Sequence, residues 1–530
     1  MRPSQTNLKT RLVFGFFLIY FLTYPIEVFT AHVQKKDYSP EKILNNIYVS
    51  CGYFLKSKPK IKITQNSIQA AVFQPSSNTI LLDAKLIRIC RSFNHDSTQA
   101  LAFIIAHELS HAIYKDKSSG LVPTNFLNYS SNFRQNEREE KLADIQGAFM
   151  AYLAGYDPSK VLSILIEKIY KSYNLSDSPQ DNYPSLNERK QTTKLVLEQV
   201  DNLISVFETS NILTAKGEYE LATAGYNYIL QFYRGPEVLN NFGINMAMQA
   251  LTFFNEETDQ YIFPFELDAN SFLKKIRKAR GPLPIEDQLR RQSLIGLAKK
   301  AFNEAIIMNP NKLAYHINLM SCILLEDQPK KCNEYFIKQG LEKYLTKKIN
   351  AENLKLNLIL GICQARLKKS PNNPYFDRVL LSDNVLLKSM AAYNKNINLN
   401  LQLKEQKSAT CRFPLIGEVT SNKLTSESLN ALKKLKLSKE NLCYSFGQLK
   451  TSNISLFSNE TGDILSINRF SKSDLGLKGQ NNFENFCLED PEVSIVLIGK
   501  KQLVFHEKYD VVYELDESGN VSEIIWFKYY

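Results

Sequence analysis

The chain has 530 residues, which is more than a single hydrophobic core usually serves, so about three domains are expected. Hydrophobic residues make up 44% of it and charged residues 22%, the composition of an ordinary globular protein. The formal net charge of +11 is spread along the chain without a lysine or arginine block, and this excludes the usual basic footprint of a nucleic-acid-binding protein.

The N-terminus has the composition of a targeting segment. Arg2, Lys9 and Arg11 precede the apolar run of residues 12–24. This run is shorter than the roughly 20 residues that span a membrane and fits the apolar region of a secretory signal. We predict that residues 1–31 are a signal peptide, with an uncleaved membrane anchor as the alternative. The protein would then be exported, and would be either periplasmic or anchored facing the periplasm.

A helix predicted for the stretch AFIIAHELSHAIYKD carries two of the six histidines of the chain. Apolar residues recur at helical spacing from Leu101 to Ala112 and give the helix a face to bury. His107 and His111 lie one turn apart, so both imidazoles can reach one tetrahedral zinc ion, with Glu108 beside them. The H-E-x-x-H pattern suits a metal-activated water whose general base is the glutamate. The alternative is a partly buried polar strip that binds no metal.

A second helix is predicted for the stretch NEREEKLADIQGAFMAYL that follows. On it, Glu140 and Asp144 lie one turn apart on one face. Gly147 is small enough to let a neighbouring helix approach closely. We interpret Glu137 and Glu139 as solvated charges, because acidic side chains are favoured in the first turn of a helix.

Together, the stretches HELSH and EKLAD resemble the gluzincin metallopeptidases of the HtpX and BepA type. The resemblance implies a mainly helical zincin-type domain in which His107, His111 and Glu140 bind one zinc ion per chain. It also implies that Glu108 is the general base. Asp144 would support the ligands without touching the metal.

The resemblance extends to both sides of these motifs. Residues 67–87 are predicted to form two short strands around a turn, followed by a helix. They are similar to the edge-strand segment with which the family can pair an extended substrate, although the usual glycine of the turn is missing. Downstream, the stretch YPSLNER has Tyr183 where the family often has a histidine, and it ends at Arg189. We expect Tyr183 to be either an oxyanion donor or a surface-loop aromatic, and we assign Arg189 to oxyanion binding or gating.

From about residue 190 the sequence changes to paired helices. Ala298, Phe302, Ala305 and Pro310 have the spacing of the second helix and following turn of a tetratricopeptide (TPR) repeat. Residues 253–287 interrupt the repeat period. We predict a degenerate array of two to four TPR-like repeats, which would form a concave α-solenoid surface for a peptide or partner protein. A generic helical bundle is the alternative.

The last part of the chain is rich in β-branched and aromatic residues separated by turn signals, which predicts a small β-rich domain. We expect its His506 to be structural. The eight cysteines of an exported chain permit disulfides within domains, and buried thiols are the alternative. The pairs considered are Cys51 with Cys90, and Cys411 with either Cys443 or Cys487.

The sequence therefore predicts an α+β protein with four segments. These are the targeting segment 1–31, a gluzincin metallopeptidase domain at 32–190, a TPR-like domain at 191–405 and a β-rich domain at 406–530. We expect an exported zinc metalloendopeptidase that cleaves protein substrates in the cell envelope, in quality control or maturation. Its repeats would bind clients or an envelope assembly partner, and its N-terminus would permit membrane association. The main rival is a repeat-bearing assembly factor or chaperone whose peptidase core is rarely or never active. A non-peptidase metal hydrolase is the weaker third reading.

Overall fold

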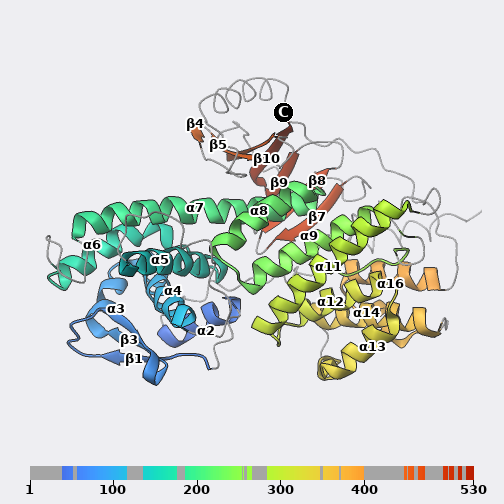
Figure 1. The fold of residues 1–530 in the computed structure, drawn as a ribbon, viewed down its shortest axis with the longest axis horizontal. Coiled ribbons are helices and arrows are strands. Elements are labelled where there is room, and N and C mark those ends of the chain that lie inside the picture. Colours follow the sequence, from blue (N-terminus) through green and yellow to red (C-terminus); the bar gives the residue numbers. More distant parts are fainter. Residues whose placement is uncertain are drawn as a thin grey trace, which may run out of the picture.

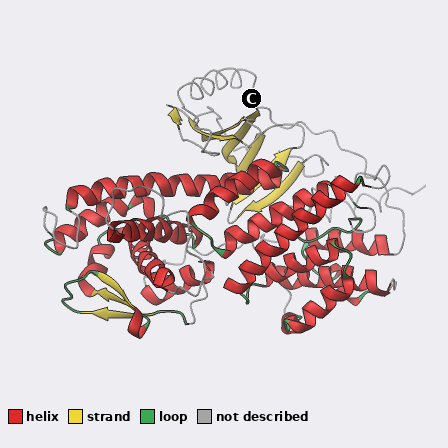
Figure 2. Cartoon of the chain, in the orientation of Figure 1, coloured by secondary structure: helices red, strands yellow, loops and turns green. Residues whose placement is uncertain are grey.

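The computed structural model describes residues 39–51, 57–115, 135–175, 185–253, 255, 259–265, 283–345, 350–368, 372–398 and seven strands between 447 and 529. Some predictions fall outside these residues: the targeting segment 1–31, Tyr183, the side chain of Glu137, and the cysteines Cys411, Cys443 and Cys487. The predicted combination of a mainly helical protein with smaller β parts is confirmed (Figure 2).

The first part of the fold combines helices with a three-stranded sheet (Figure 1). Its elements are α2 (Pro40–Cys51), β1 (Lys60–Thr64), β2 (Ala71–Gln74), β3 (Thr79–Asp83), α3 (Ala84–Arg91), α4 (Ser97–Lys115), α5 (Gln135–Leu153) and α6 (Leu162–Ser172). The strand order is β1-β3-β2, with β1 parallel and β2 antiparallel to β3. This makes β2 an edge strand of the sheet.

The two strands and the helix expected in residues 67–87 are present as β2, β3 and α3. The turn between the strands contains a short 3-10 helix, Pro75–Ser77, which ends at Asn78. Asn78 adopts a left-handed conformation with φ 47°. Asparagine tolerates this conformation better than most residues, and so the turn forms without the glycine that the resemblance leads one to expect.

Helix α7 (Leu186–Lys216) is 31 residues long and runs across α5 and α6 (Figure 1). It begins with a capping box, in which the Ser185 hydroxyl accepts a hydrogen bond from the Glu188 N–H and the Glu188 carboxylate accepts one from the Ser185 N–H. It ends at Gly217, whose φ of 94° is readily adopted only by glycine. The positions of both ends of α7 are therefore set by its sequence.

The following helices pack mainly against their neighbours in sequence. They are α8 (Tyr219–Phe232), α9 (Pro236–Thr252), α11 (Ile285–Met308), α12 (Leu313–Leu325), α13 (Pro329–Lys338), α14 (Ala351–Lys368), α15 (Pro374–Leu380) and α16 (Val385–Asn398). Ala298, Phe302 and Ala305 of α11 are fully buried, as their helical spacing leads one to expect.

The C-terminal strands form one antiparallel sheet in the order β4-β5-β6-β10-β9-β8-β7. The strands are β4 (Gly447–Leu449), β5 (Ser452–Ser458), β6 (Ile464–Ser471), β7 (Val493–Ile498), β8 (Lys501–His506), β9 (Val511–Leu515) and β10 (Val521–Tyr529). The sheet packs on α7 and α8, and the Lys216 ammonium lies 4.5 Å from the ring centroid of the buried Phe527. This contact joins the end of α7 to β10.

Two large hydrophobic clusters form the interior. The first extends from α2 to the start of α9 and includes residues of the C-terminal sheet, and the second extends from the middle of α9 to α16. The domain boundary predicted after residue 190 falls inside α7, and the first cluster continues across it. Within the part of the chain that the structure covers, no helix is both long and apolar enough to cross a membrane.

Candidate metal centre

The site is built on α4 and α5, which approach each other closely at Gly147. A Cβ atom at this position would lie 2.8 Å from both the Cα and the N atoms of His107. Only glycine therefore allows this spacing of the two backbones. The sequence places His107 and His111 on successive turns of α4, and Glu140 and Asp144 on successive turns of α5. The close crossing brings the two pairs together.

His107, His111 and Glu140 converge on one point. The Nε2 atoms of the two histidines lie 3.2 Å apart. The Glu140 carboxylate lies across both of them, with Oε2 3.4 Å from the His107 Nε2 and Oε1 3.3 Å from the His111 Nε2. About half of the Glu140 side chain is exposed, whereas the two histidines are largely buried, so the group can be reached from solvent.

These distances match those between the ligands of a tetrahedral zinc ion. Zinc binds histidine nitrogen and carboxylate oxygen at about 2.0–2.2 Å, so neighbouring ligand atoms lie about 3.3–3.5 Å apart. The donor set of two imidazoles and one carboxylate also suits zinc, and three protein ligands leave a fourth position for water or substrate. The residues therefore fit the ion that the sequence predicts.

Behind the three converging side chains lies a chain of charged contacts. The Nδ1 atom of His107 is 2.9 Å from the Asp144 Oδ1, which favours the tautomer that leaves the Nε2 lone pair for a metal. Arg189 of α7 binds both oxygens of the same carboxylate, at 2.9 Å from Oδ1 and 2.7 Å from Oδ2. The side chains of His107, Asp144 and Arg189 are largely buried. The capping box of α7 fixes the helix start from which Arg189 extends.

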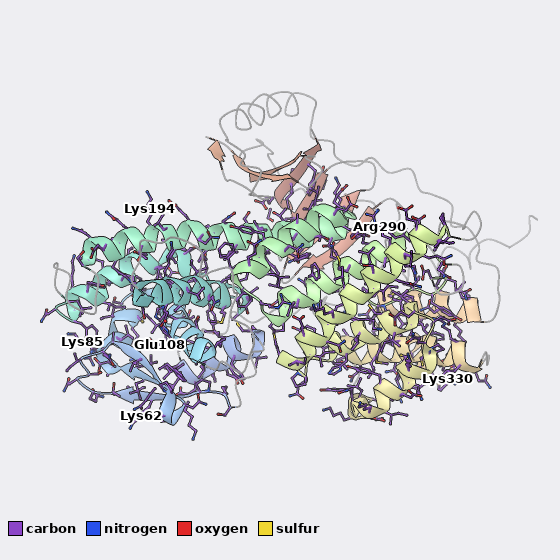
Figure 3. All side chains as sticks on the ribbon, in the orientation of Figure 1. Lys62, Lys85, Glu108, Lys194, Arg290 and Lys330 are labelled. Carbon is purple, nitrogen blue, oxygen red and sulfur yellow. The ribbon has the colours of Figure 1, made fainter. Side chains whose placement is uncertain are left out.

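Glu108 lies beside the histidine pair in the interior of the first part of the fold. Figure 3 shows it among the surrounding elements, whereas Lys62, Lys85 and Lys194 lie at the periphery. Its Oε2 accepts a hydrogen bond of 2.7 Å from the backbone N–H of Phe73, in the edge strand β2. Burial raises the pKa of the Glu108 carboxyl, while the nearby histidines and the Phe73 N–H oppose this rise.

The electrostatics favour a cation at the centre. Burial lowers the pKa of His107, but the Asp144 and Glu140 carboxylates outweigh this and raise it to about 10. Burial also opposes ionisation of Glu140, but the two histidines hold its pKa well below the usual range. The Asp144 and Glu140 carboxylates therefore favour a positive charge at this point of the site.

The remaining predicted residues have different surroundings. Glu139 is partly buried and lies outside the converging group, while Tyr183 and the side chain of Glu137 lie outside the described residues. Arg189 contacts Asp144, and Asp144 contacts His107. Arg189 therefore helps to position the His107 imidazole. The Phe73 contact could not be predicted from the sequence, because a backbone N–H has no signature there.

The described cysteines are buried thiols and are not paired as disulfides, so the Cys51–Cys90 bridge considered above is absent from the structure. The Cys51 thiol instead donates a hydrogen bond to the carbonyl of Met150. The sequence permitted either disulfides or buried thiols, and the described cysteines are buried thiols.

Comparisons of the whole chain with protein-family models, with curated proteins and with solved structures find no match. The assignment of a function therefore depends on the geometry of the site.

Proposed function

We propose that the protein is an exported zinc metalloendopeptidase of the gluzincin class, which cleaves protein substrates in the cell envelope in quality control or maturation. The observation that carries this proposal is the convergence of His107, His111 and Glu140 at the ligand spacing of tetrahedral zinc. The buried Glu108 beside them and Asp144 behind His107 add support, because a scaffold for binding alone needs neither.

The residues have separate roles in this proposal. A zinc ion at the centre would supply Lewis-acid polarisation of the scissile carbonyl and would lower the pKa of water. Glu108 would accept a proton from the attacking water and pass it to the leaving amine. The Phe73 N–H binds Oε2 and orients the carboxylate, so the transfer would fall to Oε1. Asp144 and Arg189 would hold the imidazole of His107 in place.

Three variants test the proposal. Glu108→Gln should retain zinc but lose about 10²–10⁴-fold in the cleavage of an unfolded protein such as casein, because only the base is removed. Glu140→Gln should lose both zinc and cleavage. Glu139→Gln is the matched control and should keep both. Cleavage at the wild-type rate by Glu108→Gln, or wild-type protein that binds no zinc, would contradict the proposal.

We further propose that α9 to α16 form the TPR-like array that binds a client or an envelope assembly partner. Two observations support this proposal. Each helix packs on its neighbours in sequence, and α11 has exposed apolar side chains. Leu289 and Ile307 lie five helical turns apart and so share one face.

A Glu108→Gln protein should trap clients, and adding Leu289→Glu and Ile307→Glu should release them. An added Lys330→Glu is the control, because it changes charge elsewhere on the array without touching this face. Retention of every partner by the double variant would exclude a role for the α11 face.

The rival function, an assembly factor or chaperone whose site rarely cleaves, draws support from one contact. The Phe73 N–H binds Oε2 of Glu108 and opposes the rise in the pKa of this carboxyl, which makes it a weaker base. The same co-purification separates the two functions: a chaperone would hold intact clients in the wild-type protein, whereas a peptidase would hold them only in Glu108→Gln.

The proposed location depends on the basic and then apolar N-terminus, and fractionation of cells tests it. We expect the protein in the periplasmic or membrane fraction. Full-length protein in the cytosolic fraction alone would refute export.

A further inference from the structure

Two cysteines of the helical array lie side by side on different helices. Cys332 is on the first turn of α13 and Cys363 is on α14, and the two thiols lie within hydrogen-bonding distance of each other. Both side chains are buried. Cys322 of α12 is also a buried thiol, but the groups that act on its charge are Glu326, Lys299 and Arg291 and not a second thiol. The array therefore contains a thiol pair and, on the next helix, a single thiol for comparison.

The hydrogen bond with Cys332 lowers the pKa of the Cys363 thiol, whereas burial raises it. Its thiol lies against the N-terminal turn of α13, where it donates a hydrogen bond of 3.2 Å to the carbonyl oxygen of Pro329 and accepts one from the backbone N–H of Asn333. The N-terminus of a helix favours negative charge, and Arg366 follows one turn later on α14. Cys363 is therefore the thiol of the pair that ionises first, while its partner and burial raise the pKa of Cys332.

We propose that Cys332 and Cys363 form a disulfide that joins α13 to α14. The function proposed above, export to an oxidising compartment, is the condition under which the bond would form in the cell. The oxidant is a small-molecule disulfide such as oxidised glutathione, or a thiol oxidoreductase in its disulfide form.

The chemistry is thiol–disulfide exchange. The Cys363 thiolate attacks one sulfur of the oxidant, and one thiol of the oxidant leaves. The Cys332 thiol then loses its proton and its sulfur attacks the mixed disulfide, which releases the second thiol. Two protein thiols are oxidised and one disulfide of the oxidant is reduced. Because both sulfurs are buried, we expect the bond to form while α13 and α14 are still docking, or during local opening.

The bond would have a structural effect on the array. α13 contacts mainly α12 and α14, so its attachment depends on a small interface. A covalent link closes the chain between α13 and α14 and restricts the unfolded state, which stabilises the folded array. Oxidation would therefore stabilise the part of the protein that we propose binds partners.

Purified full-length protein is unfolded, refolded in glutathione buffers of increasing oxidised fraction, denatured with an alkylating agent and mapped by mass spectrometry. This test needs neither export nor zinc, so its failure is separate from failure of the proposed function. We expect loss of alkylation at both Cys332 and Cys363 and a peptide cross-linked through these two residues. The thermal unfolding midpoint of the array should rise with oxidation.

Two variants sharpen the result. Cys363→Ser should leave Cys332 open to alkylation and remove the effect of oxidation on the unfolding midpoint. Cys322→Ser, which removes the buried thiol of α12, should leave the cross-link intact. Full alkylation of Cys332 and Cys363 in the most oxidising buffer would overturn the proposal, as would their pairing with other cysteines. The wild-type map decides the matter even if a variant fails to fold.

Discussion

Glu140 closes the metal centre from the opposite helix, and its substitution is the most direct test of the ligand set. Glu140→Gln removes the only negatively charged member of the converging group, so the zinc content of the purified protein should fall to a small fraction of the wild-type value. The neighbouring Glu139→Gln should retain full zinc, because successive helix residues point about 100° apart. Metal analysis by mass spectrometry measures both. Full zinc in the Glu140 variant would remove this residue from the site.

Arg189 and Asp144 form a buried ion pair in which each partner depends on the other. Arg189→Met leaves the Asp144 carboxylate without its main counter-charge and should lower the free energy of unfolding by about 3–5 kcal/mol. Asp144→Asn should weaken zinc binding by about 10–100-fold, through loss of the support for His107.

The double variant Asp144→Asn with Arg189→Met should regain most of the stability lost by Arg189→Met, without regaining zinc affinity. Chemical denaturation and zinc titration report the two quantities separately. Equal loss of stability in the single and double variants would show that the charge pair is not the cause.

At the scale of single residues, the sequence was informative wherever the chemistry lay in side chains at helical spacing. The His107 and His111 pair followed from such spacing, the choice of Glu140 as the third ligand followed from the family resemblance, and the structure brings the three predicted ligands together. The contact of Glu108 with Phe73 did not follow, because it joins a side chain to a backbone N–H of another element. The part of Arg189 in holding Asp144 also depends on a long-range contact that one sequence does not reveal.

Among the elements, the crossing of α4 and α5 depends on one glycine. Gly147→Ala would place a methyl group 2.8 Å from the His107 backbone, so α5 would have to move away and carry Glu140 with it. We expect a loss of stability of about 1–3 kcal/mol together with weaker zinc binding.

Gly296→Ala on α11 is the matched control for this substitution. It has open space around the new methyl group and should stabilise its helix by about 0.5–1 kcal/mol. Thermal unfolding and zinc titration of the two variants test the comparison. Wild-type zinc affinity in Gly147→Ala would show that the site tolerates a wider crossing.

The packing of α12 on α13 contains a histidine that makes stability depend on pH. His316 is buried between the Tyr335 hydroxyl, 2.6 Å from Nδ1, and the Pro310 carbonyl, 2.8 Å from Nε2. Burial lowers its pKa, so the folded state favours neutral imidazole. The unfolded chain binds the proton more readily, at about pH 6.5. The contribution to stability is therefore present above this pH and is lost as the pH falls towards the lower pKa of the folded state.

Thermal unfolding at about pH 7.5 and about pH 5 measures this effect. The wild-type unfolding midpoint should fall more between these two conditions than that of His316→Gln. His95→Gln removes an exposed histidine and should behave as the wild type does. An identical fall in all three proteins would assign the pH dependence to other groups.

At the scale of the whole molecule, a substitution in one hydrophobic cluster should destabilise the elements of that cluster and leave those of the other cluster nearly unchanged. Phe527 of β10 belongs to the first cluster and Phe376 of α15 to the second, and both are fully buried. Phe527→Ala should cost about 3–5 kcal/mol and speed amide hydrogen exchange in α4 as well as in β10, because they share a cluster.

Phe376→Ala, a substitution of the same kind, should speed exchange in α14 and leave α4 nearly unchanged. Hydrogen exchange followed by mass spectrometry resolves these segments. Equal acceleration of α4 by both substitutions would mean that the clusters unfold as one unit.

The organisation of the chain was only partly readable from its sequence. The helical and β-rich regions followed from periodicity and residue type. The boundary near residue 190 stays a prediction, because a change in residue pattern marks where a new pattern starts and does not show which core its helices join. Leu186–Lys216 begins the second pattern in sequence but buries its side chains in the first cluster.

Helix α7 is also a mechanical connection. Its first turn holds Arg189 against Asp144, and its last residue, Lys216, lies on Phe527 of the C-terminal sheet. A helix of this length is a rod of about 46 Å, and so a tilt of about 2° about one end displaces the other by about 1.6 Å. Such a displacement is large compared with the tolerance of a metal ligand. A force on the C-terminal sheet would therefore be transmitted along α7 to Arg189. Through Asp144 it would displace the imidazole of His107.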